Sequence, residues 1–346
     1  MARISEASLK RFAATALEAV GTPPASAAIV AETLVEADKR GLHSHGVLRL
    51  TVYLAAVRAS GIFPDAEMRW VSDDKAVAVL DAAFGFGQVA MLEATDFAIR
   101  RANEVGAAVV GVRNSTHFGA GSFWASRLAA QGLACIITSN TGPVVAPFGS
   151  RSPILGTNPM TIGVPTLGDP FLLDMATSEA AYGKIVAAAA EGASIPSTWA
   201  VDADGSSTED PAAALAGALL PFGGHKGSGL AIAVELLSSA LVGSRSSHEI
   251  TDIWVDPSSQ MGTGHLIIAF RSPVPEETMR EKSQALLDFM RSSDPAKGHA
   301  EVMTPGDVEN RRVRAAQESG IELSDGIRSQ MQALADELTI DLDFDL

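Results

Sequence analysis

Apolar residues recur at helical spacing near both ends of the chain. In residues 5–59, Leu9, Phe12 and Ala16 lie three or four positions apart, so they would share one face of a helix. Glycine and proline between such stretches predict turns. The same periodicity returns towards the C-terminus, at 275–291 and 309–338. We therefore expect helices at both ends of the chain.

The centre of the chain follows a different pattern. Short runs of apolar and β-branched residues, bounded by glycine or proline, are typical of buried strands. These runs lie at 77–80, 107–112, 133–137, 161–164, 171–173 and 264–270. Helical segments interleave with them at 91–105, 122–131 and 230–241. A stretch rich in alanine and serine, 190–218, is typical of a surface excursion. The pattern predicts a mixed α/β centre between helical ends.

Composition narrows the class of protein. The chain has 346 residues with 41 acidic and 26 basic side chains, so its formal net charge is −15, and 47% of its residues are hydrophobic. Such a chain is globular, and its length suits two or three domains. Nucleic acids and anionic membranes attract basic surfaces, so the acidic balance argues against both as partners. The single cysteine, Cys135, excludes an intramolecular disulfide and fits the cytoplasm. No apolar run approaches the ~18 residues of a membrane helix.

The segment 41–49 carries two histidines and an arginine. Ser44 stands where an N-cap would open a helix that continues to residue 57, and His45 and Arg49 would share one face of it. Reduction of a 2-oxo acid needs a proton donor with a pKa near neutrality, as histidine has, and a cation such as a guanidinium to hold the carboxylate. On pattern alone, a capping serine, a structural histidine and a surface arginine are the favoured interpretation. A zinc site lacks a third ligand at a recognisable spacing, so we predict no metal.

Three glycine-rich turns could hold a nucleotide. The first, GFGQVA at 85–90, lacks the acidic residue that a dinucleotide-binding fingerprint places about 20 positions later, so a tight turn into a helix is favoured. The second, 114–121, would bring backbone N–H groups and His117 together between a strand and a helix, or it is a plain loop. The third, PFGGHKGSG at 221–229, places Lys226 at a helix start, where a phosphate would bind favourably; a flexible lid is the alternative.

Taken in order, these segments resemble the malate/L-lactate dehydrogenase family, which also includes sulfolactate and ureidoglycolate dehydrogenases, diketogulonate reductase and the cyclic-imino-acid reductases. The resemblance runs from about Ile4 to the C-terminal helices. It is carried by AD-x-RG-x-x-SHG-x-x-R at 37–49, GFGQVA at 85–90, RNSTHFG at 113–119, LGTNP at 155–159, DMATS at 174–178, PFGGHKGSGL at 221–230 and PGDVENRR at 305–312.

The resemblance implies a fold and an assembly. The fold class is α/β, with the family's own non-Rossmann nicotinamide-binding domain beside a helical domain built from both chain ends. We place the first at 74–299 and the second, for substrate binding and dimerisation, at 1–73 with 300–346. The family usually forms homodimers, and its cofactor is NAD or NADP.

The resemblance also assigns roles to residues. The catalytic pair falls on Ser44 and His45, and substrate binding on Arg49 and Thr157. Cofactor contacts fall on His117, Phe118, Gly119, Ala120, Gly121, Met175, Ala176, Thr177, His225, Lys226, Thr304, Pro305 and Gly306. In some members the histidine matching His117 is the proposed acid/base. We favour His45, because Ser44 can orient it and Arg49 lies one turn away.

The expected reaction interconverts a small 2-hydroxy acid and its 2-oxo acid, as malate, lactate or sulfolactate enzymes do. Reduction of a cyclic imino acid, such as piperideine-2-carboxylate or pyrroline-2-carboxylate, is the alternative. Imino-acid reductases carry an acidic relay residue where this chain has Gly183 and Lys184, whereas the histidine in GGHKGS leans towards that branch. A third alternative, a nucleotide- or metabolite-binding protein that keeps the fold without turnover, fits poorly with an intact set of Ser44, His45 and Arg49.

Overall fold

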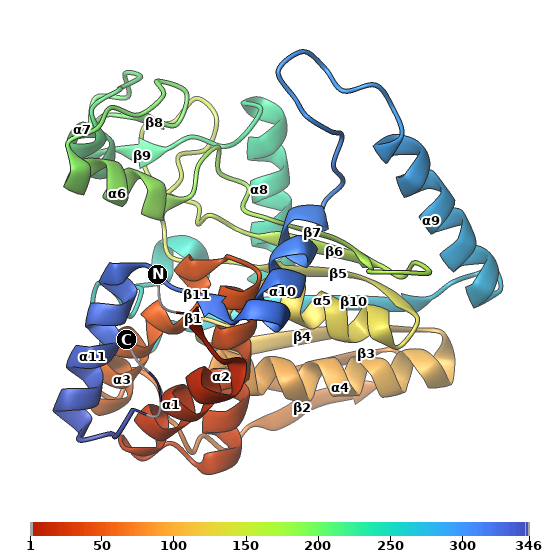
Figure 1. The fold of residues 1–346 in the computed structure, drawn as a ribbon, viewed down its shortest axis with the longest axis horizontal. Coiled ribbons are helices and arrows are strands. Elements are labelled where there is room, and N and C mark those ends of the chain that lie inside the picture. The colour runs from red at the N-terminus through yellow and green to blue at the C-terminus, as the bar shows by residue number, and fades with distance from the viewer. Residues whose placement is uncertain (1–2, 343, 345–346) are drawn as a thin grey trace.

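The computed structural model describes residues 3–342 and residue 344. Its centre is a seven-stranded sheet in the order β2-β3-β4-β10-β5-β6-β7 (Figure 1). The strands are β2 (Arg69–Asp74), β3 (Val77–Asp81), β4 (Ala107–Ser115), β5 (Leu133–Ser139), β6 (Met160–Val164), β7 (Phe171–Met175) and β10 (Thr263–Arg271). β3 and β4 are parallel, and the other neighbours are antiparallel. The expected strands are therefore present, and β10 enters the sheet between β4 and β5 from far along the chain.

Helices cover both faces of this sheet. α4 (Gly87–Val105) packs against β4 and β10, and α5 (Gly121–Ala130) against β5, β6 and β7. These two helices and the sheet enclose a hydrophobic core, to which Cys135 and Ile137 on β5 contribute. Thr138 follows Ile137 directly along the strand, so it points to the opposite face. There its hydroxyl accepts a 2.8 Å hydrogen bond from Ser238, on α8 (His225–Ser238).

Helices from the two ends of the chain lie together beside the sheet (Figure 1). Their buried side chains form a second hydrophobic cluster. Its helices are α1 (Glu6–Glu18), α2 (Pro24–Lys39), α3 (Leu50–Arg58), α10 (Asp307–Ser319) and α11 (Asp325–Leu338). The short strands β1 (Arg3–Ile4) and β11 (Ile321–Glu322) pair antiparallel and tie the ends together. The predicted helix 309–338 is therefore interrupted. Gly320, at a φ of 86°, ends α10 and turns the chain into β11.

The stretch 190–218 is more than a surface excursion. It contributes to a small lobe that contains α6 (Tyr182–Glu191), α7 (Pro211–Ala216) and the paired strands β8 (Ala200–Val201) and β9 (Ala218–Leu219). The lobe has its own hydrophobic cluster, which includes Val145, Ile185 and Leu219, all fully or almost fully buried. The members of this cluster are spread along the chain from Val145 to Ala231, so local periodicity did not reveal it.

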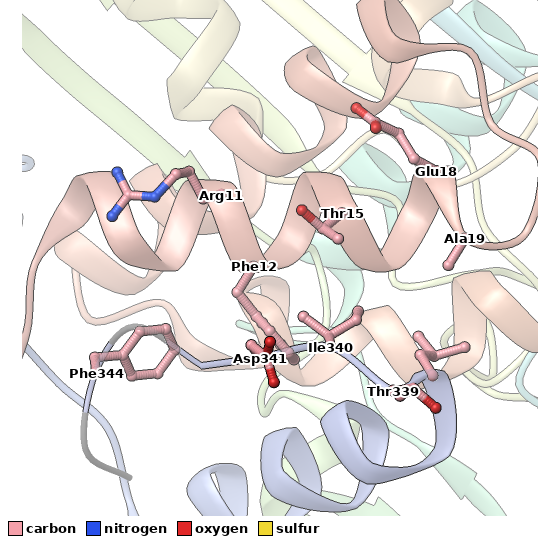
Figure 2. Close-up of a pocket in the computed structure, with 10 residues that line it drawn as sticks. Arg11, Phe12, Thr15, Glu18, Ala19, Thr339, Ile340, Asp341 and Phe344 are labelled. Carbon is pink, nitrogen blue, oxygen red and sulfur yellow. The ribbon is translucent and has the colours of Figure 1, made fainter.

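Two peripheral features complete the fold. α9 (Glu276–Arg291) projects from the body, and residues 292–303 return from it to α10 (Figure 1). A pocket of about 620 Å³ lies between α1 and the C-terminal segment, where Phe12 and Phe344 meet edge to face. Figure 2 shows the residues that line it. None of the residues expected in the active site lines this pocket. Within the described residues, no helix combines the length and apolar character needed to cross a membrane.

Candidate active site

The segment with Ser44 and His45 does not form the expected helix. Two short 3₁₀ turns, η1 (His43–His45) and η2 (Val47–Arg49), precede α3. Gly46 separates them in an extended conformation, with a φ of −88° and a ψ of −159°. The prediction that Ser44 caps a helix to residue 57 is therefore wrong, as is the shared helical face of His45 and Arg49.

A buried carboxylate on α2 explains the break. Asp38 accepts a 2.8 Å hydrogen bond from the backbone N–H of Val47 and lies 2.8 Å from Nδ1 of His43. A Cβ at residue 46 would lie 2.1 Å from Oδ1 of Asp38, so only glycine fits there. Asp38 thus supplies the cap that was expected of Ser44, and the Ser44 hydroxyl is left for another partner.

The three residues nevertheless meet through direct contacts. Oγ of Ser44 lies 2.9 Å from Nδ1 of His45, and Nε of Arg49 donates a 2.6 Å hydrogen bond to the backbone carbonyl of Ser44. A serine hydroxyl can donate to or accept from an imidazole nitrogen. The arrangement therefore orients the His45 ring and fixes the Arg49 side chain to the same turn.

Trp254 and Asp252, in the loop after residue 249, surround the guanidinium. The guanidinium carbon of Arg49 lies 4.8 Å from the centre of the Trp254 ring. Burial raises the pKa of Asp252 to about 6, although hydrogen bonds from Gly142 and Trp254 and the charge of Arg49 oppose this. Because Nε of Arg49 is engaged by Ser44, the two terminal Nη groups are the donors that remain for a bidentate contact with a carboxylate.

A second histidine lies beside the first. His117 follows β4, and the centres of the His45 and His117 rings are 5.4 Å apart. Nδ1 of His117 lies 2.6 Å from the hydroxyl oxygen of Tyr53, on α3. The Trp254 ring meets His117 edge to face at 5.6 Å. We call His45, Arg49, Tyr53, His117 and Trp254 the histidine cluster.

Both histidines have lowered pKa values. Burial first, and the positive charge of Arg49 second, lower the pKa of His45 to about 4, against the opposing effect of Asp174. Burial, His45 and Arg49 hold the pKa of His117 well below its usual value. Both rings are therefore neutral at pH 7 without a bound anion, which corrects the expectation of a pKa near neutrality. A neutral imidazole is a base, and an anion paired with Arg49 would raise the pKa of His45 again.

The predicted cofactor segments 117–121 and 175–177 converge at one edge of the sheet. Asp174, near the end of β7, accepts a 2.8 Å hydrogen bond from the backbone N–H of Ser122 in the first turn of α5. It also accepts a 2.8 Å hydrogen bond from Thr161 on β6. A Cβ at Gly121 would lie 2.0 Å from Oγ1 of Thr161, so this approach of α5 to the sheet requires glycine.

Two further predicted segments join them. The backbone N–H of Thr177 donates to the carbonyl of Thr157 at 2.8 Å, and the N–H of Phe222 donates to the carbonyl of Thr177 at 3.1 Å. The predicted substrate residue Thr157 and the loop before His225 and Lys226 are thus neighbours of residues 175–177. Helix α8 begins directly at His225 and has no side-chain cap at its first turn.

The turn 304–306 lies against the edge strand β7. A Cβ at Gly306, where φ is 96°, would lie 3.6 Å from the backbone of Leu172. Asp307 accepts a 2.7 Å hydrogen bond from the backbone N–H of Thr304 and forms an ion pair with Arg291. The turn is therefore rigidly held beside the strand that ends at Met175. No hydrogen bond or ring contact within the described residues ties it to the histidine cluster.

Sequence reasoning missed several members of the site. Tyr53 lies four residues after Arg49 and could have been noticed by that spacing, whereas Trp254 and Asp252 stand in an irregular loop without a signal. Gln88 belongs to GFGQVA, which forms the expected tight turn into α4. His265 is fully buried between the hydroxyls of Ser115 and Ser139, each 2.9 Å from a ring nitrogen.

Comparison with known proteins gives consistent matches over the whole chain. The sequence profile described as malate/L-lactate dehydrogenase matches residues 4–332. The L-sulfolactate dehydrogenase of Methanocaldococcus jannaschii is 36% identical over 336 residues, which cover 96% of each chain. The (2R)-3-sulfolactate dehydrogenase (NADP(+)) of Chromohalobacter salexigens is 34% identical over 96% of this chain and 98% of its own. The ureidoglycolate dehydrogenase (NAD(+)) of Escherichia coli O157:H7 is 35% identical over 94% and 93%.

Solved structures share the fold. The sulfolactate dehydrogenase of Methanocaldococcus jannaschii has a TM-score of 0.92 and 36% identity, with 99% of each chain covered. The delta1-piperideine-2-carboxylate reductase of Pseudomonas syringae pvar. tomato has a TM-score of 0.88 and 32% identity, with 97% of this chain and 100% of that chain covered. The mixed α/β architecture predicted from the sequence is confirmed.

Proposed function

The chain belongs to the malate/L-lactate dehydrogenase family, and from this premise we propose that it interconverts a small 2-hydroxy acid and its 2-oxo acid with NAD or NADP. The observation that carries the proposal is the joined set of Ser44, His45 and Arg49. It brings together an imidazole that can exchange a proton and a guanidinium whose Nη groups have no hydrogen-bond partner among the described residues, on the two adjacent turns η1 and η2. A substrate whose carboxylate is adjacent to the reacting carbon would meet both groups.

Each residue of this turn has a distinct task. Arg49 holds the carboxylate through its terminal Nη groups, in the planar fork geometry that a lysine cannot reproduce. His45, neutral in the free protein, takes the hydroxyl proton when the hydroxy acid is oxidised and returns it when the oxo acid is reduced. Ser44 orients the His45 ring through Nδ1. The charge of a bound carboxylate offsets that of Arg49, so a protonated His45 becomes less unfavourable in the complex.

A dinucleotide fits the residues expected to hold it. The first turn of α8 offers backbone N–H groups without a side-chain cap, and the exposed Lys226 lies beside them. Gly223, at a φ of 57°, has no atom within 4 Å of a built Cβ, so the loop is open at this point. Bound nicotinamide would supply or accept the hydride. We propose that 117–121, 175–177, His225, Lys226 and 304–306 hold the cofactor, with the α8 start facing a phosphate.

The alternative substrate class is a cyclic imino acid. The similar piperideine-2-carboxylate reductase structure supports it. However, Gly183 has open space around it, and the ammonium of Lys184 lies 5.8 Å from the centre of the Trp199 ring. These positions therefore provide no acidic relay to an imine nitrogen. The oxo acid remains the better supported substrate.

We further propose the family's non-Rossmann nicotinamide-binding domain at 74–299, the helical domain at 1–73 with 300–346, a homodimer and a cytoplasmic location. The predominantly antiparallel sheet supports the first, since Rossmann sheets are mostly parallel. Two separate hydrophobic clusters support this division into two domains. The sheet itself begins with β2 at Arg69, shortly before the proposed boundary at residue 74. The projecting α9 supports the dimer, because Phe289 is 75% exposed and Leu286 54% exposed on it.

A steady-state assay tests the proposed function. Purified protein is mixed with NADH or NADPH and with oxaloacetate, pyruvate, sulfopyruvate, piperideine-2-carboxylate or pyrroline-2-carboxylate, and the loss of reduced nicotinamide is followed by absorbance. Turnover with one of the 2-oxo acids supports the proposal. Turnover with imino acids alone establishes the alternative. Nucleotide binding without turnover of any substrate would identify a binding protein that has lost catalysis.

A further inference from the structure

Two buried polar side chains, Gln88 and Tyr53, form a hydrogen-bonded chain that ends at the half-buried His117. The side-chain Nε2 of Gln88, on α4, donates a 2.8 Å hydrogen bond to the hydroxyl oxygen of Tyr53. That oxygen lies 2.6 Å from Nδ1 of His117. Tyr53 and Gln88 are both fully buried. The three residues come from α3, α4 and the loop after β4, so the whole fold is required to bring them together.

The positions of the protons follow from the chemistry of the three groups. An amide NH₂ group only donates, and a phenol has one hydrogen to give. Burial raises the pKa of Tyr53, so this hydrogen is retained at neutral pH. Within the described residues, its oxygen has no other hydrogen-bond partner than Gln88 and His117. With the Gln88 amide donating to Tyr53 as it does here, a proton on Nδ1 of His117 would leave the Tyr53 hydrogen buried without an acceptor, which costs about 1–3 kcal/mol.

We infer that Tyr53, held by Gln88, is a positioning residue that fixes His117 as the tautomer with its proton on Nε2. The Nε2–H group would be a hydrogen-bond donor directed away from Tyr53, and no described residue hydrogen-bonds to it. His117 then polarises an oxygen of the substrate or cofactor without giving up its proton, while His45 exchanges one. The role in the reaction rests on the proposed function, whereas the tautomer itself does not.

Nitrogen NMR of the free protein tests the tautomer directly. The chain has seven histidines, which can be labelled with ¹⁵N and resolved by long-range correlation of ring nitrogens and carbon-bound protons. A spectrum of His117→Asn identifies the signals of His117. We expect a protonated Nε2 and an unprotonated Nδ1 in the wild type at pH 7. A protonated Nδ1, or equal averaging over both nitrogens, would overturn the inference, whether or not any substrate is turned over.

Two variants test the origin of the tautomer. Tyr53→Phe keeps the ring that packs edge to face on Phe86 at 6.0 Å but removes the hydroxyl. We expect mixed His117 tautomers and a kcat lowered roughly 3- to 10-fold, as expected for one neutral hydrogen bond. Gln88→Met should shift the spectrum in the same direction. The other tyrosine, Tyr182, is 40% exposed on α6, so Tyr182→Phe is the matched control.

The outcomes separate a positioning role from a structural one. Loss of the single His117 tautomer in Tyr53→Phe, with an unchanged spectrum in Tyr182→Phe, supports the inference. A Tyr53→Phe protein that keeps the Nε2-protonated signal and full kcat contradicts it. If Tyr53→Phe fails to fold, as judged by circular dichroism, the wild-type spectrum and that of Gln88→Met still decide. Absence of turnover in the wild type would refute the proposed function and leave the tautomer measurement valid.

Discussion

Nε of Arg49 donates a 2.6 Å hydrogen bond to the backbone carbonyl oxygen of Ser44, the residue whose hydroxyl contacts His45. The cation and the imidazole are therefore held by two adjacent short turns, 43–45 and 47–49, that this hydrogen bond joins. Movement of either side chain would disturb the other. Under the proposed function, this coupling would hold the carboxylate and the adjacent carbon of a substrate in a fixed relation to the His45 ring.

Replacing Arg49 with lysine should weaken substrate binding. An ammonium cannot reproduce both the Nε contact with Ser44 and the terminal fork, so we expect KM for the oxo acid to rise at least about tenfold, equivalent to ~1.4 kcal/mol. We also expect some loss of kcat, because the substitution removes the Nε contact that ties Arg49 to Ser44, the residue that orients His45. Steady-state kinetics of Arg49→Lys measure both. An unchanged KM would remove Arg49 from the substrate site.

Trp254 should act through Arg49. Its ring lies 4.8 Å from the guanidinium carbon, and a cation–π contact of this kind contributes about 0.5–2 kcal/mol. We expect Trp254→Leu to raise KM for the substrate several-fold, with a smaller change in kcat. Trp254→Phe retains an aromatic face, so its KM for the substrate should lie between those of Trp254→Leu and the wild type. If the KM values of Trp254→Leu and Trp254→Phe both match that of the wild type, the cation–π contact does not contribute to substrate binding.

The pH profiles of the two directions should differ. The pKa of His45 is lowered to about 4, so in the free protein the neutral form predominates at every higher pH. Oxidation of the hydroxy acid needs this form, and its kcat/KM should show no loss attributable to His45 between pH 5 and 7. Reduction needs the protonated form, so its kcat/KM should fall as pH rises through the same interval. Equal profiles in both directions would contradict this assignment.

His265 should make the fold sensitive to acid. Burial lowers its pKa to about 3 in the folded protein, whereas the unfolded chain has an ordinary value near 6.5. Between these values the unfolded state binds more protons, so stability falls as pH falls. From pH 7 to 5 this amounts to about 2 kcal/mol for one histidine. The free energy of unfolding, measured with urea at both pH values, should depend less on pH in His265→Gln than in the wild type. Equal dependence would mean that His265 titrates normally.

The sequence predicted the sheet better than the site. Runs such as 107–112 are apolar along their length because they are buried between helices, and this pattern is local. β2 was missed because its residues, Arg69–Asp74, are mostly polar and exposed at the sheet edge. The break at Gly46 depends on the carboxylate of Asp38, and the contact of Tyr53 with His117 joins residues 64 positions apart. Neither can be inferred from periodicity, because each depends on how α2, α3 and β4 pack.

The sequence identifies the motif residues but does not reveal how they are arranged in space. Ser44, His45 and Arg49 were singled out together, but by a helical spacing that the protein does not use. Residues 157, 177 and 222 belong to three separate sequence motifs, and backbone hydrogen bonds make them neighbours. The resemblance to a known family identified these residues, whereas the structure shows how they meet.

The central claim is that His45 exchanges the proton, and comparison of His45→Ala with His117→Ala tests it most directly. We predict that His45→Ala lowers kcat by roughly 10²–10⁴-fold, the usual contribution of a positioned acid or base. Binding of reduced nicotinamide cofactor, measured by its fluorescence, should persist in this variant. His117→Ala should cost less in kcat, because His117 donates a hydrogen bond without giving up its proton. A His45→Ala protein with near-normal kcat, together with an inactive His117→Ala protein that still binds cofactor, would contradict the account.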